Sequence, residues 1–526
     1  MLQLLLGGSG SGKTTLLYQR IRARAEKGEK SILLVPEQFT SSTEGRIYRE
    51  LGDALSGMVE SFSFTSLAEK ILSTEGGAAV QTLSDAGRAV LVRRALEELQ
   101  DNVHYYHRHR RSAAFCQMAA QTIDELKSAG LSGRQLAQLA GACGAESGKL
   151  SELALIFQGY ETLLARSGMD PSDRLELAGA RLEEALARHS LPEFLRDRAV
   201  FIDEFDTFNA PKKRLLGAML AALPSVTVAL CDDGAPLLPG DLSLFSGAKQ
   251  VAAQLRQLAR KNGAEVAVPQ LLRKDLRHRN APGLAAVAEL LETGSCTADA
   301  PAGEVRLFAA PSREEEARAA AGAVRRLMRQ GVRCGKIAVV CRDIAKYRAA
   351  VRYEFRMAEI PLYCDEPTTP EFSAPATAVR ALLEIARGAD LTENLTTLAK
   401  TGLCALSEEQ VCALENYAYT WAPTAAAWRE KFERSPKGFG EQELTEEDLR
   451  NRERAEHARA LLVGAVDAFR AKVRGVNAEA ISRAVYFCLK TLGAEEQQAA
   501  QVKAIRAGRG IPAAEEAARE WNVVMG

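Results

Sequence analysis

The feature that most constrains this chain is a glycine-rich segment close to its first residue, which fits the pattern G-x-x-x-x-G-K-[ST]. An apolar run, Leu2–Leu6, precedes the segment, and an amphipathic stretch, Lys13–Lys27, follows it. Glycines let backbone N–H groups converge on phosphate oxygens, and the positive end of the following helix faces the anion. The strand–loop–helix context therefore predicts a phosphate-binding loop made of Gly7, Gly8, Ser9, Gly10, Ser11, Gly12, Lys13, Thr14 and Thr15.

The last residues of this loop predict the chemistry of a nucleoside triphosphate site. We expect the Lys13 ammonium to reach the β- and γ-phosphates of ATP and the Thr14 hydroxyl to be a ligand of Mg²⁺. A chance glycine-rich turn is the alternative, but such a turn does not require a strand before it and a helix after it. Both are indicated here.

A second acidic motif follows the apolar run Ala199–Ile202. We expect Asp203 to be the second protein ligand of Mg²⁺ and Glu204 to orient the attacking water, so that Lys13, Asp203 and Glu204 are the candidate catalytic residues. The alternative is that these carboxylates cap the next helix, since Asp206 and Asn209 beside them also fit a helix start.

Continuous apolar runs alternate with helical stretches in the first part of the chain, which predicts an α/β fold. Ser31–Val35, Ala199–Ile202 and Val226–Leu230 are typical of parallel strands that are buried on both faces. A loop near residues 293–303 separates a second α/β unit, with strands expected at 304–309 and 336–341. Ser312 and Glu315 predict a capping box at the start of the helix between them.

The length of 526 residues indicates several domains. Glycines become sparse after residue 70 and apolar residues recur at helical spacing, and after about residue 385 the chain again has only helical patterns. We predict four parts: a first core of residues 1–70 plus 196–295, a helical insertion of residues 71–195, part of a second core in residues 300–385, and a helical subdomain of residues 386–526.

The bulk properties exclude several function classes. Lys plus Arg equals Asp plus Glu, 68 against 68, so a DNA contact would need a local basic face. The ten cysteines include no C-x-x-C pair, and the apolar runs are too short to cross a bilayer. We therefore expect a reduced, cytoplasmic protein with no membrane association.

One segment, residues 104–111, interleaves two tyrosines with three histidines and three arginines. This pattern could grip a phosphate backbone and stack against bases. A solvated loop between two helices is the simpler interpretation.

The succession of motifs resembles that of superfamily 1 helicases, and more closely the B subunit of the AddAB-type helicase–nuclease of bacteria. The resemblance rests on the N-terminal GSGSGKT, residues 32–40 (ILLVPEQFT), 63–68, 203–204, 231–233, 272–279 and 337–342. It implies RecA-like cores, an A subunit as partner in a heterodimer, and single- and double-stranded DNA as substrates. It also implies a C-terminal nuclease domain with an iron–sulphur cluster, whose motifs do not occur in these residues.

The departures from this pattern bear on activity. No glutamine follows the acidic residues of 231–236, and no late arginine motif follows Arg342. We expect these residues to be the N-terminal part of a longer protein that binds ATP and has little motor activity of its own. The resemblance implies that this part guides or scans single-stranded DNA. An autonomous ATP-driven DNA helicase is the second hypothesis, and an unrelated phosphotransferase with a helical lid is the third.

Overall fold

The computed structural model describes residues 1–77, 79, 81–144, 147–295, 304–364, 370–440 and 443–525, with the exception of the Ser41 side chain. The chain divides into two compact units, Met1–Phe308 and Ala309–Gly526, and each is described by itself. In these ranges no helix has both the length and the apolar character needed to cross a membrane.

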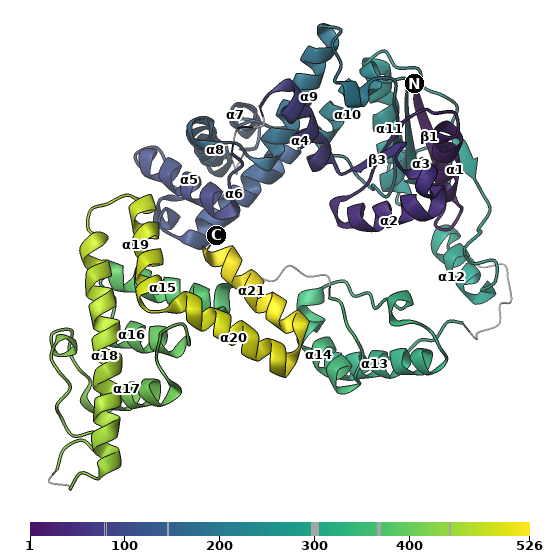
Figure 1. Ribbon diagram of the computed structural model, residues 1–526. Coiled ribbons are helices and arrows are strands. Elements are labelled where there is room, and N and C mark those ends of the chain that lie inside the picture. Colours follow the sequence, from purple (N-terminus) through teal and green to yellow (C-terminus); the bar gives the residue numbers. More distant parts are fainter. Residues whose placement is uncertain are drawn as a thin grey trace. The chain divides into compact units, whose positions relative to one another are not determined.

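The first unit contains a six-stranded sheet in which every neighbouring pair is parallel (Figure 1). The order is β3-β2-β4-β5-β1-β6. The strands are β1 (Leu2–Gly7), β2 (Ser31–Leu34), β3 (Val59–Phe62), β4 (Ala199–Ile202), β5 (Ser225–Cys231) and β6 (Gln270–Leu272). This confirms the predicted α/β class with a parallel sheet, to which the structure adds β3 and β6.

Helices cover both faces of this sheet because side chains alternate along each strand. Leu2, Leu4 and Leu6 of β1 pack in one core, while Leu5 between them packs in another. The first core is completed by α4 (Phe64–Glu75), α9 (Pro171–Ala187), α10 (Ala210–Ala222) and α11 (Ser246–Lys261), and the second by α1 (Lys13–Ala25) and α2 (Thr40–Leu51).

Between β3 and β4 the chain forms a group of helices with a core of its own. These are α5 (Asp85–Glu98), α6 (Ala113–Ser128), α7 (Gly133–Ala140) and α8 (Ser147–Ser167). The chain enters and leaves this group side by side, because the Leu83 N–H donates to Met169 O at 3.0 Å and the Met169 N–H to Gln81 O at 3.1 Å. The next helix, α9, packs against α4 and α10 of the sheet layer.

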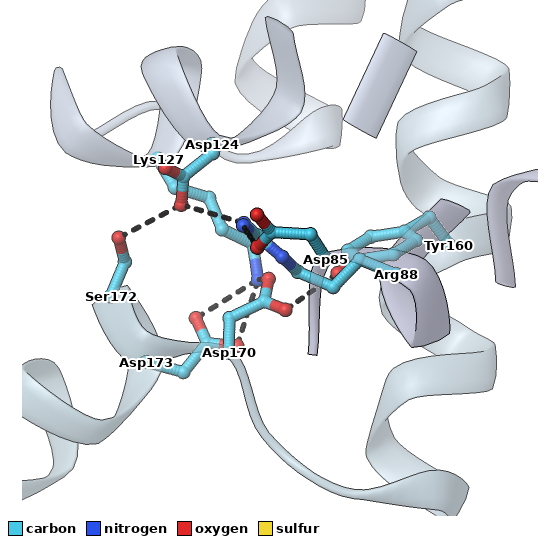
Figure 2. Close-up of polar contacts among 8 residues, drawn as sticks. All are labelled: Asp85, Arg88, Asp124, Lys127, Tyr160, Asp170, Ser172 and Asp173. Carbon is cyan, nitrogen blue, oxygen red and sulfur yellow. Dashed lines mark hydrogen bonds and ion pairs between the residues drawn. The ribbon is translucent and has the colours of Figure 1, made fainter. Parts of the chain in front are cut away.

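A buried ionic network lies where the helical group meets α9 (Figure 2). Asp170, the residue before α9, accepts from the Tyr160 hydroxyl at 2.6 Å and from Lys127 Nζ at 2.9 Å. Lys127 also donates to Asp173 at 2.8 Å. The Asp170 side chain is only 1% exposed, so its charge depends on these partners rather than on water.

The same network extends to α5. Arg88 pairs with Asp85 at 2.7 Å and with Asp124 of α6 at 3.3 Å, and Asp124 also accepts from the Ser172 hydroxyl. Residues of α5, α6, α8 and α9 are thus joined through adjoining carboxylates, as Figure 2 shows. The network fixes the helical group to the helix that packs on the sheet layer.

The second unit is helical in its described residues. It begins with α13 (Arg313–Arg329) and α14 (Ile344–Met357), which share a small core. A larger core joins helices α15 (Ala374–Arg387), α16 (Leu391–Lys400), α17 (Glu408–Trp421), α18 (Glu446–Lys472), α19 (Ala478–Thr491), α20 (Ala494–Arg509) and α21 (Ile511–Met525). The finer division into four parts stays a prediction.

The prediction of strands at 304–309 and 336–341 is wrong. Neither segment pairs with another strand in the described residues, so the backbone lacks the ladder partners that define a strand. Leu307 is fully exposed and Val340 is 90% exposed. The expected second parallel sheet is therefore absent from the described residues of this part, although the helix between the two segments forms as predicted.

Only one of the two hydrogen bonds of the predicted capping box is present at the start of that helix. The Ser312 hydroxyl accepts from the Glu315 N–H at 3.3 Å. The Glu315 carboxylate pairs instead with Arg318, at 2.6 Å. A nearby arginine thus competes with the backbone N–H for the carboxylate.

The buried network predicts a large effect of one substitution. Asp170→Ala removes the buried carboxylate that accepts hydrogen bonds from the Lys127 ammonium and the Tyr160 hydroxyl. We expect the free energy of local opening of α8 and α9 to fall by about 3 kcal/mol. Hydrogen exchange measures this, with Asp101→Ala, an exposed change in the same helical group, as the control. A loss equal to that of the control would show that the network does not fix the two helices.

Candidate nucleotide-binding site

The predicted loop lies at the carboxyl edge of the parallel sheet, where segments that follow several strands converge. A pocket of about 530 Å³ opens there. It is lined by Ser9, Gly10, Gly12, Lys13, Thr14, Thr15, Arg46, Asp203, Glu204, Phe205, Asp206, Ala229, Cys231, Leu276 and Arg277. Ligands of open parallel sheets bind at this edge.

The backbone of the loop has the shape that an anion requires. Gly10 and Gly12 have φ values of 79° and 90°, which favour glycine. A Cβ on Gly7 would lie 2.6 Å from the carbonyl oxygen of Leu272. Gly12 is the N-cap of α1 and provides no side-chain acceptor, so the first N–H groups of that helix are available to a phosphate.

Lys13 is held over the loop by the loop itself. Its ammonium donates to the carbonyl oxygens of Gly7 and Gly8, both at 2.8 Å. Burial lowers the pKa of Lys13, and the carboxylate of Asp203 acts in the opposite direction. The Lys13 ammonium therefore lies within the loop whose backbone N–H groups would bind phosphate oxygens.

Asp203 and Thr14, the two predicted Mg²⁺ ligands, lie together. Asp203 follows β4 and is 6% exposed. Burial raises its pKa, whereas hydrogen bonds from the Thr14 hydroxyl and the Glu204 N–H, and the charges of Lys13 and Arg46, act to lower it. An oxygen pair of this kind, one hydroxyl and one carboxylate, suits the hard Mg²⁺ ion.

Glu204 lies next to Asp203 in an unusual backbone conformation. Its φ of 64° is in the left-handed region, which costs a non-glycine residue about 1–2 kcal/mol. Strain of this kind concentrates at functional sites. Burial raises the pKa of Glu204, and the neighbouring Asp203 charge raises it further.

The helix that follows the acidic pair is capped by Asn209 and not by Asp203 or Glu204. Asn209 is the N-cap of α10, and its side chain accepts from the Lys212 N–H at 3.1 Å. Neither Asp203 nor Glu204 caps this helix. Both carboxylates therefore remain at the pocket.

One hydroxyl of the loop is buried without a partner in the part of the chain that the structure describes. Ser11 is 6% exposed, and its Oγ has no hydrogen-bond partner in the described residues. A buried polar atom without a partner is costly. No three His, Cys, Asp or Glu side chains in the described ranges converge on a separate metal position.

Comparison with known proteins places the chain in a family. The family model "ADDB, N-terminal" matches residues 4–288, which is more than half of the 526 residues. The chain belongs to the ADDB family. The resemblance inferred from the motif succession is thereby confirmed.

Curated relatives agree with this family. The B subunit of an "ATP-dependent helicase/deoxyribonuclease" from Desulforudis audaxviator is 32% identical over 446 residues, which cover 81% of this chain and 37% of the relative. The protein of the same name from Moorella thermoacetica is 29% identical over 100% of this chain and 46% of its own length. The chain therefore spans less than half of these relatives.

Sequence reasoning did not assign two arginines that line the pocket. After β6, the Arg277 guanidinium donates to Ser9 Oγ at 3.2 Å, and the Leu276 N–H donates to Gly10 O at 3.0 Å. Arg46 of α2 lies over the Tyr18 ring, 4.9 Å from its centroid. The segment 272–279 was part of the motif succession, but only the parallel placement of β6 beside β1 brings it over the loop.

The packing of this segment yields a prediction with a matched control. Gly10→Ala and Gly28→Ala both place a side chain at positive φ, 79° and 77°, at a cost of about 1 kcal/mol. A Cβ on Gly10 would also lie 2.7 Å from Arg277 Cβ, whereas one on Gly28 meets nothing within 4 Å. We expect Gly10→Ala alone to abolish binding of a fluorescent ATP analogue. Equal binding by both variants would contradict this geometry.

Proposed function

We propose that this chain is the ATP-binding, helicase-like part of the B subunit of a heterodimeric helicase–nuclease that processes DNA double-strand breaks for recombinational repair. In this role it guides or scans single-stranded DNA. Family membership and the names of the relatives support the proposal. The observation that carries it is that Thr14 and Asp203 line one pocket together with Gly10, Gly12 and Lys13 of the loop.

The proposed roles follow from where each group lies. The loop N–H groups and the Lys13 ammonium bind the phosphates of ATP, and Thr14 and Asp203 hold Mg²⁺. Mg²⁺ supplies neutralisation of the phosphate charge. Glu204 orients water in the pocket, and the guanidinium of Arg277 adds a positive charge beside Ser9.

The partners in this proposal are the A subunit and DNA, in single- and double-stranded form, in the cytoplasm. The word "subunit" in the relatives' names supports a partner chain. The nuclease activity in those names is not assigned to any residue described here, and neither is an iron–sulphur cluster.

A second candidate function is that of an autonomous ATP-driven DNA helicase. The observation that favours it is that the pocket contains a complete acidic pair, Asp203 and Glu204, together with Arg277. An arginine that stabilises the transferring phosphoryl group is worth roughly three to five orders of magnitude in rate. The two functions therefore differ in turnover rather than in binding.

Lys13→Ala tests the nucleotide site directly. We expect this variant to lose binding of MgATP, because Lys13 is the ammonium that the carbonyl oxygens of Gly7 and Gly8 hold over the loop. Calorimetric titration of the intact chain measures the binding. Lys27→Ala, a change beyond the end of α1, is the matched control. Unchanged affinity in Lys13→Ala would refute the ATP site.

The rate of ATP turnover separates the two functions. For the proposed guiding subunit, we expect slow turnover by the chain alone, with or without single-stranded DNA. Turnover on the order of tens of molecules per second, within the range of phosphoryl-transfer enzymes, that Lys13→Ala abolishes would replace this proposal with the autonomous helicase.

A further inference from the structure

Residues 104–111, called the basic loop below, lie between α5 and α6 and contact side chains of α6 and α8. The loop contains a short 3₁₀ turn, His107–His109, and lies on the helical group of the first unit. Three features of the loop bear on what it binds: how its backbone is held, which rings it presents, and which charges surround it.

The backbone of the loop is held by one carboxylate from α8. Glu152 accepts from three successive backbone N–H groups, those of His104, Tyr105 and Tyr106, at 2.9, 2.8 and 3.2 Å. Partial burial acts to raise the pKa of Glu152, but these donors lower it overall. The conformation of the loop is therefore fixed before any partner binds, which reduces the entropy lost on binding.

Two aromatic rings of the loop pack against α6, and a third ring, that of Tyr105, is largely exposed. Tyr106 and His109 pack against Phe115 of α6, with ring centroids 5.3 and 5.6 Å away. Tyr105 is 56% exposed, with Tyr106 against its edge and Lys149 Nζ 5.2 Å from its centroid. Tyr106 and His109 therefore have a structural role in the packing of the loop, whereas much of the Tyr105 ring faces solvent.

The side chains of the loop carry only positive charge, although the Glu152 carboxylate that holds its backbone is negative. Arg108 and Arg111 are both exposed, and neither forms an ion pair within the described ranges. Carboxylates at the end of α5 are engaged elsewhere, since Glu97 pairs with Arg93 and Glu98 with Arg94. The loop sequence contains no acidic residue. An exposed ring among cations favours a polyanion that carries planar groups.

We propose that the basic loop is a contact site for single-stranded DNA, with Tyr105 stacking on a base while Arg108 and Arg111 bind adjacent phosphates. The inference rests on the proposed function, which gives the chain DNA as a substrate, and adds where on the chain that DNA is held. Stacking on a fixed ring tolerates any base, so the site contributes affinity without sequence preference.

Binding of a fluorescein-labelled oligothymidylate to the intact chain tests this site. By anisotropy, we expect Tyr105→Ala to weaken binding about tenfold and Tyr105→Phe to restore it, because stacking needs the ring and not the hydroxyl. Replacing Arg108 and Arg111 with glutamine should reduce the slope of log affinity against log salt by roughly 0.7 for each lost phosphate contact.

Arg134→Gln, an exposed charge change on α7 of the same helical group, is the matched control and should leave both affinity and slope near those of the unchanged chain. Salt-dependent binding that none of the loop variants alters would overturn this inference and leave the proposed function intact. Binding of poly-L-glutamate with the same dependence on Tyr105 would overturn it too, and assign the loop to an acidic protein partner. Absence of any salt-dependent DNA binding would overturn both the inference and the DNA-guiding role.

Discussion

Thr14 and Asp203 line one pocket, although they follow two strands that are not neighbours. Thr14 follows β1 and Asp203 follows β4, and β5 lies between those strands in the sheet. The two side chains reach the same pocket because all the strands are parallel, so that the segments after each of them meet at one edge. Everything proposed for the nucleotide site depends on this arrangement, since neither group alone distinguishes a phosphate-binding loop from a site that also holds a metal ion.

Strands of the sheet that are marked by continuous apolar runs could be predicted from the sequence, and strands without such runs could not. β1, β2, β4 and β5 have mostly buried residues. The missed strands lie at the two edges of the sheet, where β3 has a single buried residue and β6 has none. Burial on both faces is what makes a parallel strand recognisable, and edge strands lack it. The apolar runs at 304–309 and 336–341 show the reverse error, because an apolar run does not supply a partner strand.

The site was predicted in its local parts but not in its assembly. The loop, Asp203 and Glu204 have sequence patterns that depend on the adjacent strand and helix alone. Arg46 and Arg277 have no such pattern. Arg277 reaches Ser9 only because β6 pairs with β1, and Arg46 faces the pocket only because its helix packs beside Tyr18 of α1. Sequence reasoning is weakest for side chains whose position depends on tertiary packing, and here these include two arginines that line the pocket.

The helical group combines a rigid attachment with an exposed binding surface. The network around Asp170 fixes the group to α9, and Glu152 fixes the basic loop to α8. Both features use a carboxylate with several donors, which orders backbone or helices without adding apolar area. A DNA strand held at Tyr105 would thus contact a helical group that is joined through α9 to the sheet layer with the candidate nucleotide site.

The central claim is that three separate segments of the chain form one nucleotide site. Hydrogen exchange of the intact chain, with and without a slowly hydrolysed MgATP analogue, tests this most directly. The account predicts that the analogue protects backbone N–H groups in residues 8–15, 203–206 and 275–278 together, and that Lys13→Ala removes the protection in all three segments. Protection confined to residues 8–15, or no protection at all, would contradict it.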